Sequence, residues 1–209
     1  MSIEKINPGD STAVTVTRGG GNLESVELHG VYNAICYDKD GNIKWSEQFP
    51  NAVTTQGKNA ILDRYFGGSS ITSGSQGGPS ANTNANRFTW YMGLIASNGY
   101  SAISTNDTHN LHTGWLESGA DGARAPGYVQ ATRRKITFAA SSSGSKATSN
   151  AVVFTINVAG TIKGAFIANS AVKASTNSSA VIYSAGLFTV GDKIVTSGDT
   201  LNVTYTASA

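Results

Sequence analysis

Charged side chains, cysteine and long apolar runs are all scarce in this chain of 209 residues. Charged residues make up 13% of the sequence, and fifteen Lys and Arg against thirteen Asp and Glu leave a net charge of +2. Binding to a nucleic-acid backbone usually requires a far more basic surface. We therefore expect no direct nucleic-acid partner.

A single cysteine, Cys36, excludes an internal disulfide. It lies in the apolar stretch 31–37, which predicts a buried thiol. No stretch approaches the roughly 18 apolar residues of a membrane span, and residues 1–5 lack the basic start and apolar run of a secretory signal. We expect a protein made in a cytoplasm, with no membrane partner, that owes its stability to packing and assembly.

Glycine, by contrast, is abundant at 24 residues, and glycine-containing turns separate strand-like segments. Asp40-Gly41 is a strong hairpin-turn signal, because glycine tolerates the positive φ needed there. Apolar residues alternate along 152–158, and Gly-Asp pairs at 191–192 and 198–199 precede short strands. This spacing predicts a mainly β fold with an antiparallel β-sandwich or jelly-roll-like body.

One short α-helix is predicted over residues 56–66, with Thr55 as its N-cap. Its apolar residues are spaced to share one buried face: Ile61, Leu62, Tyr65 and Phe66. A strand over residues 88–95 is apolar throughout and should be buried on both faces. A further strand is predicted within residues 128–138.

Two segments stand apart from this body. Residues 1–22 read as an N-terminal arm with one short strand around Val14 and Val16, followed by three glycines. Such an arm either is a mobile terminus or pairs with an exposed sheet edge of a neighbouring chain. Residues 23–209 then form a single β-rich domain that carries a Gly/Ser/Asn-rich insertion at 67–86.

Three consecutive cations, Arg133, Arg134 and Lys135, lie in the predicted strand 128–138. They are either half-exposed strand cations or contacts to acidic residues of a partner protein, where they would set register. Together with Val14 and Val16 they form the candidate interface of the chain.

His109 and His112, with Asp107 and Glu117 nearby, are the one cluster of metal-ligand residue types. A His-Glu-x-x-His pattern is missing, so the alternative is a polar loop with two exposed histidines. We expect no metal and no cofactor.

Signs of catalysis are equally sparse in the sequence. A Gly-x-Ser-x-Gly motif is missing. Asp107, Glu117 and Asp121 could converge as an acid pair, but acids scattered over turns give the same pattern. We expect a protein that is not an enzyme.

Three groups of segments resemble, in their order, a family of tailed-bacteriophage virion structural proteins. The first is 40–45 with 51–59, the second 90–95 with 107–108 and 114–117, and the third 191–192 with 198–205. The resemblance covers most of residues 29–206.

The resemblance implies a structural component of the virion. The leading expectation is a capsid cement or decoration protein that binds the major capsid protein and copies of itself and stabilises the head. The alternatives are a tail, collar or fibre component, which would bind tail or portal proteins, and a protein that binds a host receptor.

Overall fold

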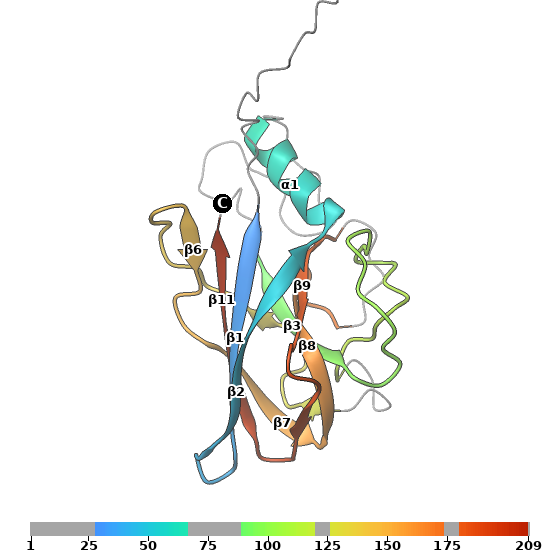
Figure 1. The fold of residues 1–209 in the computed structure, drawn as a ribbon, viewed down its shortest axis with the longest axis vertical. Helices are drawn as coiled ribbons and strands as arrows, with labels where there is room; N and C mark the ends of the chain where they lie inside the picture. The colour runs from blue at the N-terminus through green and yellow to red at the C-terminus, as the bar shows by residue number, and fades with distance from the viewer. Residues whose placement is uncertain (1–27, 67–88, 120–125, 174–179, 209) are drawn as a thin grey trace, which may run out of the picture.

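Figure 1 shows a computed structural model of the chain, which describes residues 28–66, 89–119, 126–173 and 180–208. The helix is α1 (Thr55–Phe66). The strands in the first half of the chain are β1 (His29–Tyr37), β2 (Ile43–Val53), β3 (Tyr91–Ala96), β4 (Gly127–Tyr128) and β5 (Arg134–Lys135). Those in the second half are β6 (Ser145–Ala147), β7 (Val152–Val158), β8 (Gly160–Ala168), β9 (Ile182–Leu187), β10 (Lys193–Val195) and β11 (Thr200–Ser208).

The strands form one curled antiparallel sheet in the order β4-β7-β11-β1-β2-β9-β8-β3-β5, with β10 beside β8 and β6 beside β11. The long strand β2 joins its two halves. Residues 43–50 pair with β1, and residues 51–53 pair with β9. The predicted mainly β fold with one helix is confirmed, and the curled sheet is compatible with a sandwich-like body.

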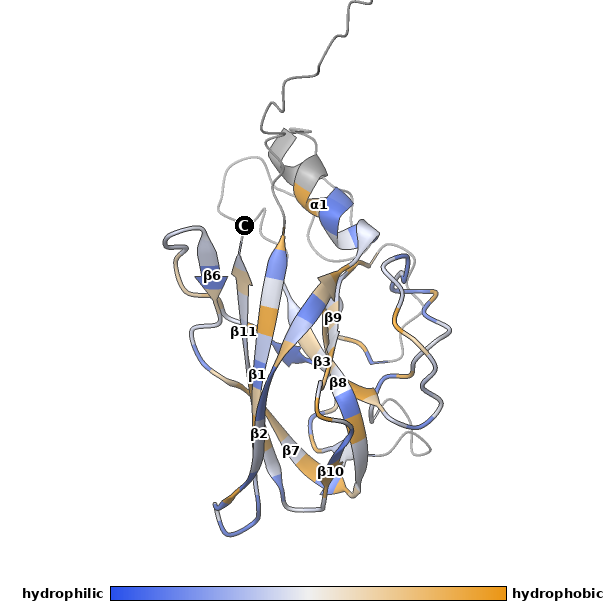
Figure 2. Ribbon diagram, viewed as in Figure 1, coloured by the Kyte–Doolittle hydropathy of each residue, from blue (hydrophilic) through white to orange (hydrophobic). Residues whose placement is uncertain are grey.

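The main core lies between the two halves of the sheet. Tyr32, Tyr205 and Phe49 are among its largest buried side chains, and Cys36 is fully buried there, as predicted. Burial alternates along β1, where Tyr32, Ala34 and Cys36 are buried and the residues between them are exposed or half-buried. Figure 2 shows hydrophobic and hydrophilic residues mixed along the strand, because both faces of β1 carry apolar side chains.

A second, smaller core lies on β3, β8 and β9 and is built around Trp115 and Phe166. Residues 97–119, which follow β3, supply its cover, because Trp115, Tyr100 and Ile103 all belong to that segment. Side chains on both faces of β3 are therefore buried. The prediction of a strand buried on both faces is confirmed for Tyr91–Ala96.

The turn between β1 and β2 forms as predicted. Gly41 has φ +86°, in the left-handed region that favours glycine. Asp38 Oδ1 accepts hydrogen bonds from the backbone N–H groups of Asp40 and Asn42, both at 2.9 Å. The loop 38–42 is thus a turn in which the Asp38 side chain accepts hydrogen bonds from the backbone N–H groups of the turn itself.

The helix differs from the prediction at its first turn. Thr54, and not Thr55, is the N-cap, because Thr54 Oγ1 accepts a hydrogen bond from the backbone N–H of Gly57 at 2.9 Å. Thr54 is buried and also donates to the carbonyl of Ile182. Thr54 and Thr55 have the same intrinsic tendency to act as an N-cap, and the contact of Thr54 with β9 determines which of them does so.

The strand predicted over 128–138 is wrong in extent, since the named strands include only Tyr128 of β4 and Arg134–Lys135 of β5 from that range. Between them the backbone leaves the ladder, and the N–H of Arg133 donates to the carbonyl of Ala171 at 2.8 Å.

The arm 1–22, with Val14 and Val16, and the insertion 67–86 lie outside the described residues. Within the described part, no helix is long and apolar enough to cross a membrane.

Candidate functional site

The three predicted interface cations occupy three different environments. Arg133 is buried, Arg134 is half-buried, and Lys135 is exposed. Arg134 and Lys135 form β5, which pairs with Met92 and Tyr91 of β3. Arg133 differs from the expectation of a half-exposed strand cation, because its side chain points into the protein.

Arg133 is the centre of a buried polar cluster. Its Nε lies 2.9 Å from Glu117 Oε1, and its Nη2 lies 3.0 Å from Glu117 Oε2. Its Nη1 donates to the carbonyl of Ser170 at 3.0 Å, and its guanidinium carbon lies 5.0 Å from the centre of the Phe166 ring. A two-point geometry of this kind is the strong form of an arginine–carboxylate pair.

His109 completes this cluster, with its Nε2 2.8 Å from Arg133 Nη1. A guanidinium can only donate, so His109 Nε2 accepts, and its imidazole does not carry a proton on that nitrogen. The ring is 1% exposed. The alternative of two exposed histidines is therefore wrong for His109, while His112 is half-buried.

A neighbouring group of contacts fixes the rest of the covering segment. Trp115 Nε1 donates to Asp107 Oδ2 at 2.8 Å, and the same oxygen accepts from the N–H of Ser104 at 2.9 Å. The His112 ring stacks on Trp115 with ring centres 4.0 Å apart, and Trp115 packs against Phe166 at 5.0 Å.

These contacts point to a structural use of the cluster. Asp107 accepts hydrogen bonds from within residues 97–119, and Glu117 accepts from Arg133, which ties the end of that segment to the residues before β5. Within the described ranges, no group of three or more His, Cys, Asp or Glu side chains is arranged to hold a metal ion. Asp121, the third acid of the catalytic hypothesis, lies outside those ranges.

Two further ion pairs connect strand β2 to the residues around β10, at the end of the body where β10 lies. Lys44 Nζ lies 2.6 Å from Asp199 Oδ2, and Lys193 Nζ lies 2.6 Å from Glu47 Oε2. Burial raises the pKa of Glu47, but hydrogen bonds from Lys193, Thr189 and Val190 outweigh it and lower the pKa to about 2.

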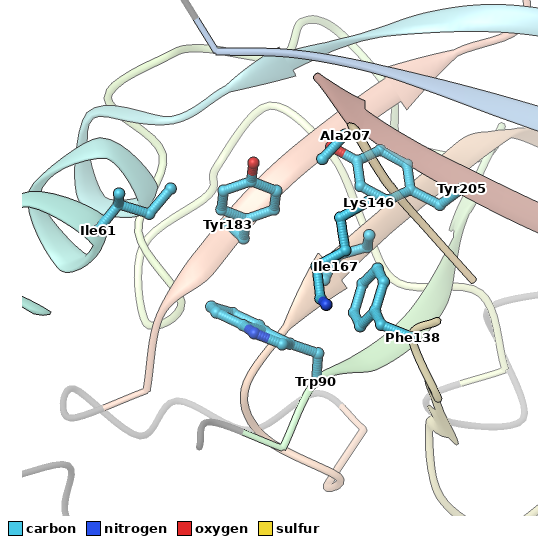
Figure 3. A pocket seen from close by; sticks show the side chains of 8 residues that line it. All are labelled: Ile61, Trp90, Phe138, Lys146, Ile167, Tyr183, Tyr205 and Ala207. Atoms are coloured by element: carbon cyan, nitrogen blue, oxygen red, sulfur yellow. The ribbon is translucent and has the colours of Figure 1, made fainter. Parts of the chain in front are cut away.

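An apolar pocket of about 190 Å³ opens at the other end of the body, near α1. In Figure 3 its four aromatic rings surround the side chains of Ile167 and Lys146; the rings are Trp90, Phe138, Tyr183 and Tyr205. The Lys146 ammonium donates to the carbonyl of Ala139 at 2.8 Å. A space of this volume suits one ring or a short aliphatic chain, since drug-sized ligands need about 300 Å³ or more.

The broad surface of the sheet is a more extensive feature. The strand register places side chains of β7, β11, β1 and β2 on one outer face, pointing away from the main core. On the two central strands these residues are Val31, Asn33, Ile35, Tyr37, Thr200, Asn202, Thr204 and Thr206. On the flanking strands they are Val153, Thr155, Ser46, Gln48 and Pro50. We call this set the outer face.

No Asp, Glu, Lys or Arg belongs to the outer face as the register of these four strands defines it. His29 lies in line with it at one end of β1. The charged residues Asp38, Lys39 and Asp40 lie in the turn that follows β1. A neutral centre with charge at its margin is the pattern of a protein–protein contact surface.

Comparisons with protein-family models, with curated proteins and with solved structures found no match. The contacts and the surfaces described above are therefore the basis for any functional conclusion.

The sequence indicates the residues of the polar cluster but not their arrangement. It offers Asp107, His109 and Glu117 as candidates for chemistry and predicts that Arg133 lies at a surface. The outer face was missed, although the alternation of Thr and Asn with apolar residues in 200–206 is a visible signal of one neutral strand face.

Proposed function

We propose that this protein is a non-enzymatic structural component of a tailed-phage particle, and specifically a capsid cement or decoration protein. It would bind the major capsid protein and copies of itself on the head. The observation that carries the proposal is that the segments responsible for the sequence resemblance contact one another in the fold.

The first and third groups of segments meet directly. Lys44 and Asp199 form the 2.6 Å ion pair, and Asn51 Nδ2 donates to the hydroxyl of Tyr205 at 2.9 Å. In each of these two pairs the partners are separated by about three quarters of the chain. Proteins that resemble this chain in both groups of segments are therefore expected to have the same contacts between them and the same fold.

The second group forms the covered side of the sheet. Glu117 forms a β-bridge with Ile95 of β3. The backbone N–H of Thr55, in the first group, donates to the carbonyl of Thr105, which lies between the parts of the second group, at 2.7 Å. The residues that carry the resemblance are therefore ones that hold the fold together. This supports a shared fold with that family and says less about a shared ligand.

The proposed mechanism is passive. A protein that binds the assembled lattice better than free subunits stabilises the assembled state by mass action. The outer face supports this role, because a broad neutral sheet surface suits packing against protein rather than against a charged polymer.

Copy number in purified particles tests the proposal. Quantitative mass spectrometry of the phage that encodes this chain should give a copy number comparable with that of the major capsid protein. A few copies per particle, recovered with isolated tails, would support a tail, collar or fibre component instead. Absence of the chain from washed particles would refute a virion role.

An add-back experiment tests the cement role separately. Particles grown without this gene should bind the purified protein over the head and should then withstand a higher temperature before they release DNA. Binding to heads with no change in that temperature would support decoration without cementing. Failure to bind such heads would count against the major capsid protein as the partner.

A further inference from the structure

We propose that the outer face is the contact surface between two copies of this chain, which pack face to face about a two-fold axis. The inference deepens the proposed function and rests on it for the expectation that copies of the chain meet. Charge and hydrogen-bonding capacity point to this occupant, and the area of the face indicates how strong the contact is.

Charge is the first argument. Two identical faces that carry charge repel each other unless opposite charges happen to be matched by the symmetry. The centre of the outer face, around Asn33, Asn202 and Thr204, contains neutral side chains alone. A second copy therefore meets no like charge there, and no charged group has to lose its water.

Hydrogen-bonding capacity is the second argument. Amide side chains both donate and accept, and so do hydroxyl side chains, so a face of Asn, Gln, Ser and Thr is complementary to itself. Asn202 already has a need for such a partner. Its Oδ1 is buried, and no described residue donates a hydrogen bond to it.

The position of Asn202 makes that observation relevant to the face. It lies on β11, between Ile35 of β1 and Val153 of β7 in the strand register. Its two cross-strand neighbours are apolar and cannot satisfy the carboxamide. A rotated Asn202 amide of one copy can pair with a hydroxyl or amide of the other.

Area decides how strong this contact is. The face spans 31–37 on β1, 200–206 on β11, 46–50 on β2 and 153–155 on β7. At about 3.4 Å per residue and about 4.8 Å between strands, these segments cover roughly 360 Å² in each copy, or roughly 720 Å² in a dimer. Stable interfaces bury about 1,000 Å² or more in total. The face falls below that limit, and we therefore expect a weak dimer that forms and dissociates with concentration.

Analytical ultracentrifugation of the purified full chain tests the interface. The wild type should shift from monomer to dimer as its concentration rises. Asn33→Lys puts a cation at an exposed position in the middle of the face and should weaken dimerisation by a factor of about ten or more. Asn98→Lys makes the same change at an exposed position after β3, and it should dimerise like the wild type.

A mixture of oppositely charged variants separates repulsion from misfolding. Asn33→Lys and Asn33→Glu should each be monomeric with an unchanged melting temperature, and an equal mixture of the two should recover the dimer. A wild type that stays monomeric at millimolar concentration would overturn the proposal. So would an Asn33→Lys variant that dimerises as Asn98→Lys does, and failure of the mixture to recover would overturn the two-fold arrangement.

These outcomes are distinguishable from those of the proposed function. A dimer in solution with no chain in the particle refutes the virion role and leaves the interface standing. Chain in the particle with a monomeric wild type refutes the interface and leaves the virion role. A monomeric wild type whose Asn33→Lys variant no longer binds heads assigns the face to the capsid protein and overturns the second copy as its occupant.

Discussion

Arg133 and Glu117 form a two-point ion pair in the interior of the protein, with side chains only 2% and 1% exposed. The pair joins the turn before β5 to the end of the segment that covers β3 and β8. Removing two charges from water costs several kcal/mol each, which only close pairing offsets. The stability of this side of the fold therefore depends on the two residues being present together.

Replacing one partner should be costly. In Glu117→Gln the Arg133 guanidinium stays buried without its counter-charge, and we expect a loss of about 3–5 kcal/mol in the free energy of unfolding. Urea denaturation measures it. Asp40→Asn, which breaks the exposed ion pair with Lys39, is the control and should cost less than about 1 kcal/mol. Equal losses in the two variants would contradict the prediction.

The double replacement Arg133→Met with Glu117→Leu should cost clearly less than the sum of the two single replacements. Each single change leaves a buried charge unpaired, whereas the double change leaves none. A double-mutant cycle from denaturation curves measures the coupling. Additive losses would mean that the two side chains act independently.

Gly93 should not tolerate even a methyl group. A Cβ at this position would lie 2.4 Å from the Phe166 ring and 3.0 Å from Glu117 Oε1. Gly93→Ala should therefore lower the free energy of unfolding by about 1–3 kcal/mol, the usual cost of overpacking. Phe166→Leu in the same chain makes room and should recover part of this loss. If the paired change costs as much as the sum of its parts, crowding against Phe166 is not the cause.

The sequence was sufficient to predict those features whose cause is local. The β1–β2 turn follows from Asp38 and Gly41, and the buried strand β3 follows from its continuous apolar run. These features need no knowledge of distant residues, because backbone conformation and hydrophobic pattern alone decide them.

The fate of Arg133 depends on distant partners and was not predictable. Three cations are consecutive in the sequence, and nothing in their local sequence distinguishes which of them is buried: Arg133, Arg134 and Lys135. Arg133 is buried because Glu117, sixteen positions earlier, and Phe166, on β8, form a site for its guanidinium. The N-cap at Thr54 was likewise decided by β9, through the carbonyl of Ile182.

The cap itself is open to test. Thr54→Val keeps the shape of the side chain but removes the oxygen that accepts from the N–H of Gly57. We expect a loss of about 1–2 kcal/mol in the free energy of unfolding. Thr55→Val changes an exposed side chain and should cost less than about 0.5 kcal/mol. A larger loss at Thr55 than at Thr54 would restore Thr55 as the cap.

Glu47 should make stability depend on pH in the acid range. Its pKa in the folded protein is lowered from 4.5 to about 2. A lowered pKa means that the ionised carboxylate stabilises the fold above about pH 4.5, and that this contribution disappears as the pH falls towards 2. The difference in stability between wild type and Glu47→Gln should therefore be largest near neutral pH and shrink between pH 4.5 and 2. A difference that is constant from pH 6 to pH 2 would contradict this assignment.

Cys36 should be unreactive until the protein opens. Burial is the main cause that raises the pKa of its thiol to about 12, and the nearby carboxylate of Asp199 acts in the same direction. The reactive thiolate is thus scarce at pH 8, and the fully buried side chain also excludes reagent. Labelling with a chromogenic disulfide reagent should be slow in buffer and fast in concentrated urea. The charge of Lys44, which pairs with Asp199 beside this thiol, acts in the opposite direction and lowers the thiol pKa. Lys44→Met should therefore slow native-state labelling further, whereas Lys39→Met, in the exposed turn, should leave it unchanged. Rapid labelling of the native wild type would refute the burial of Cys36.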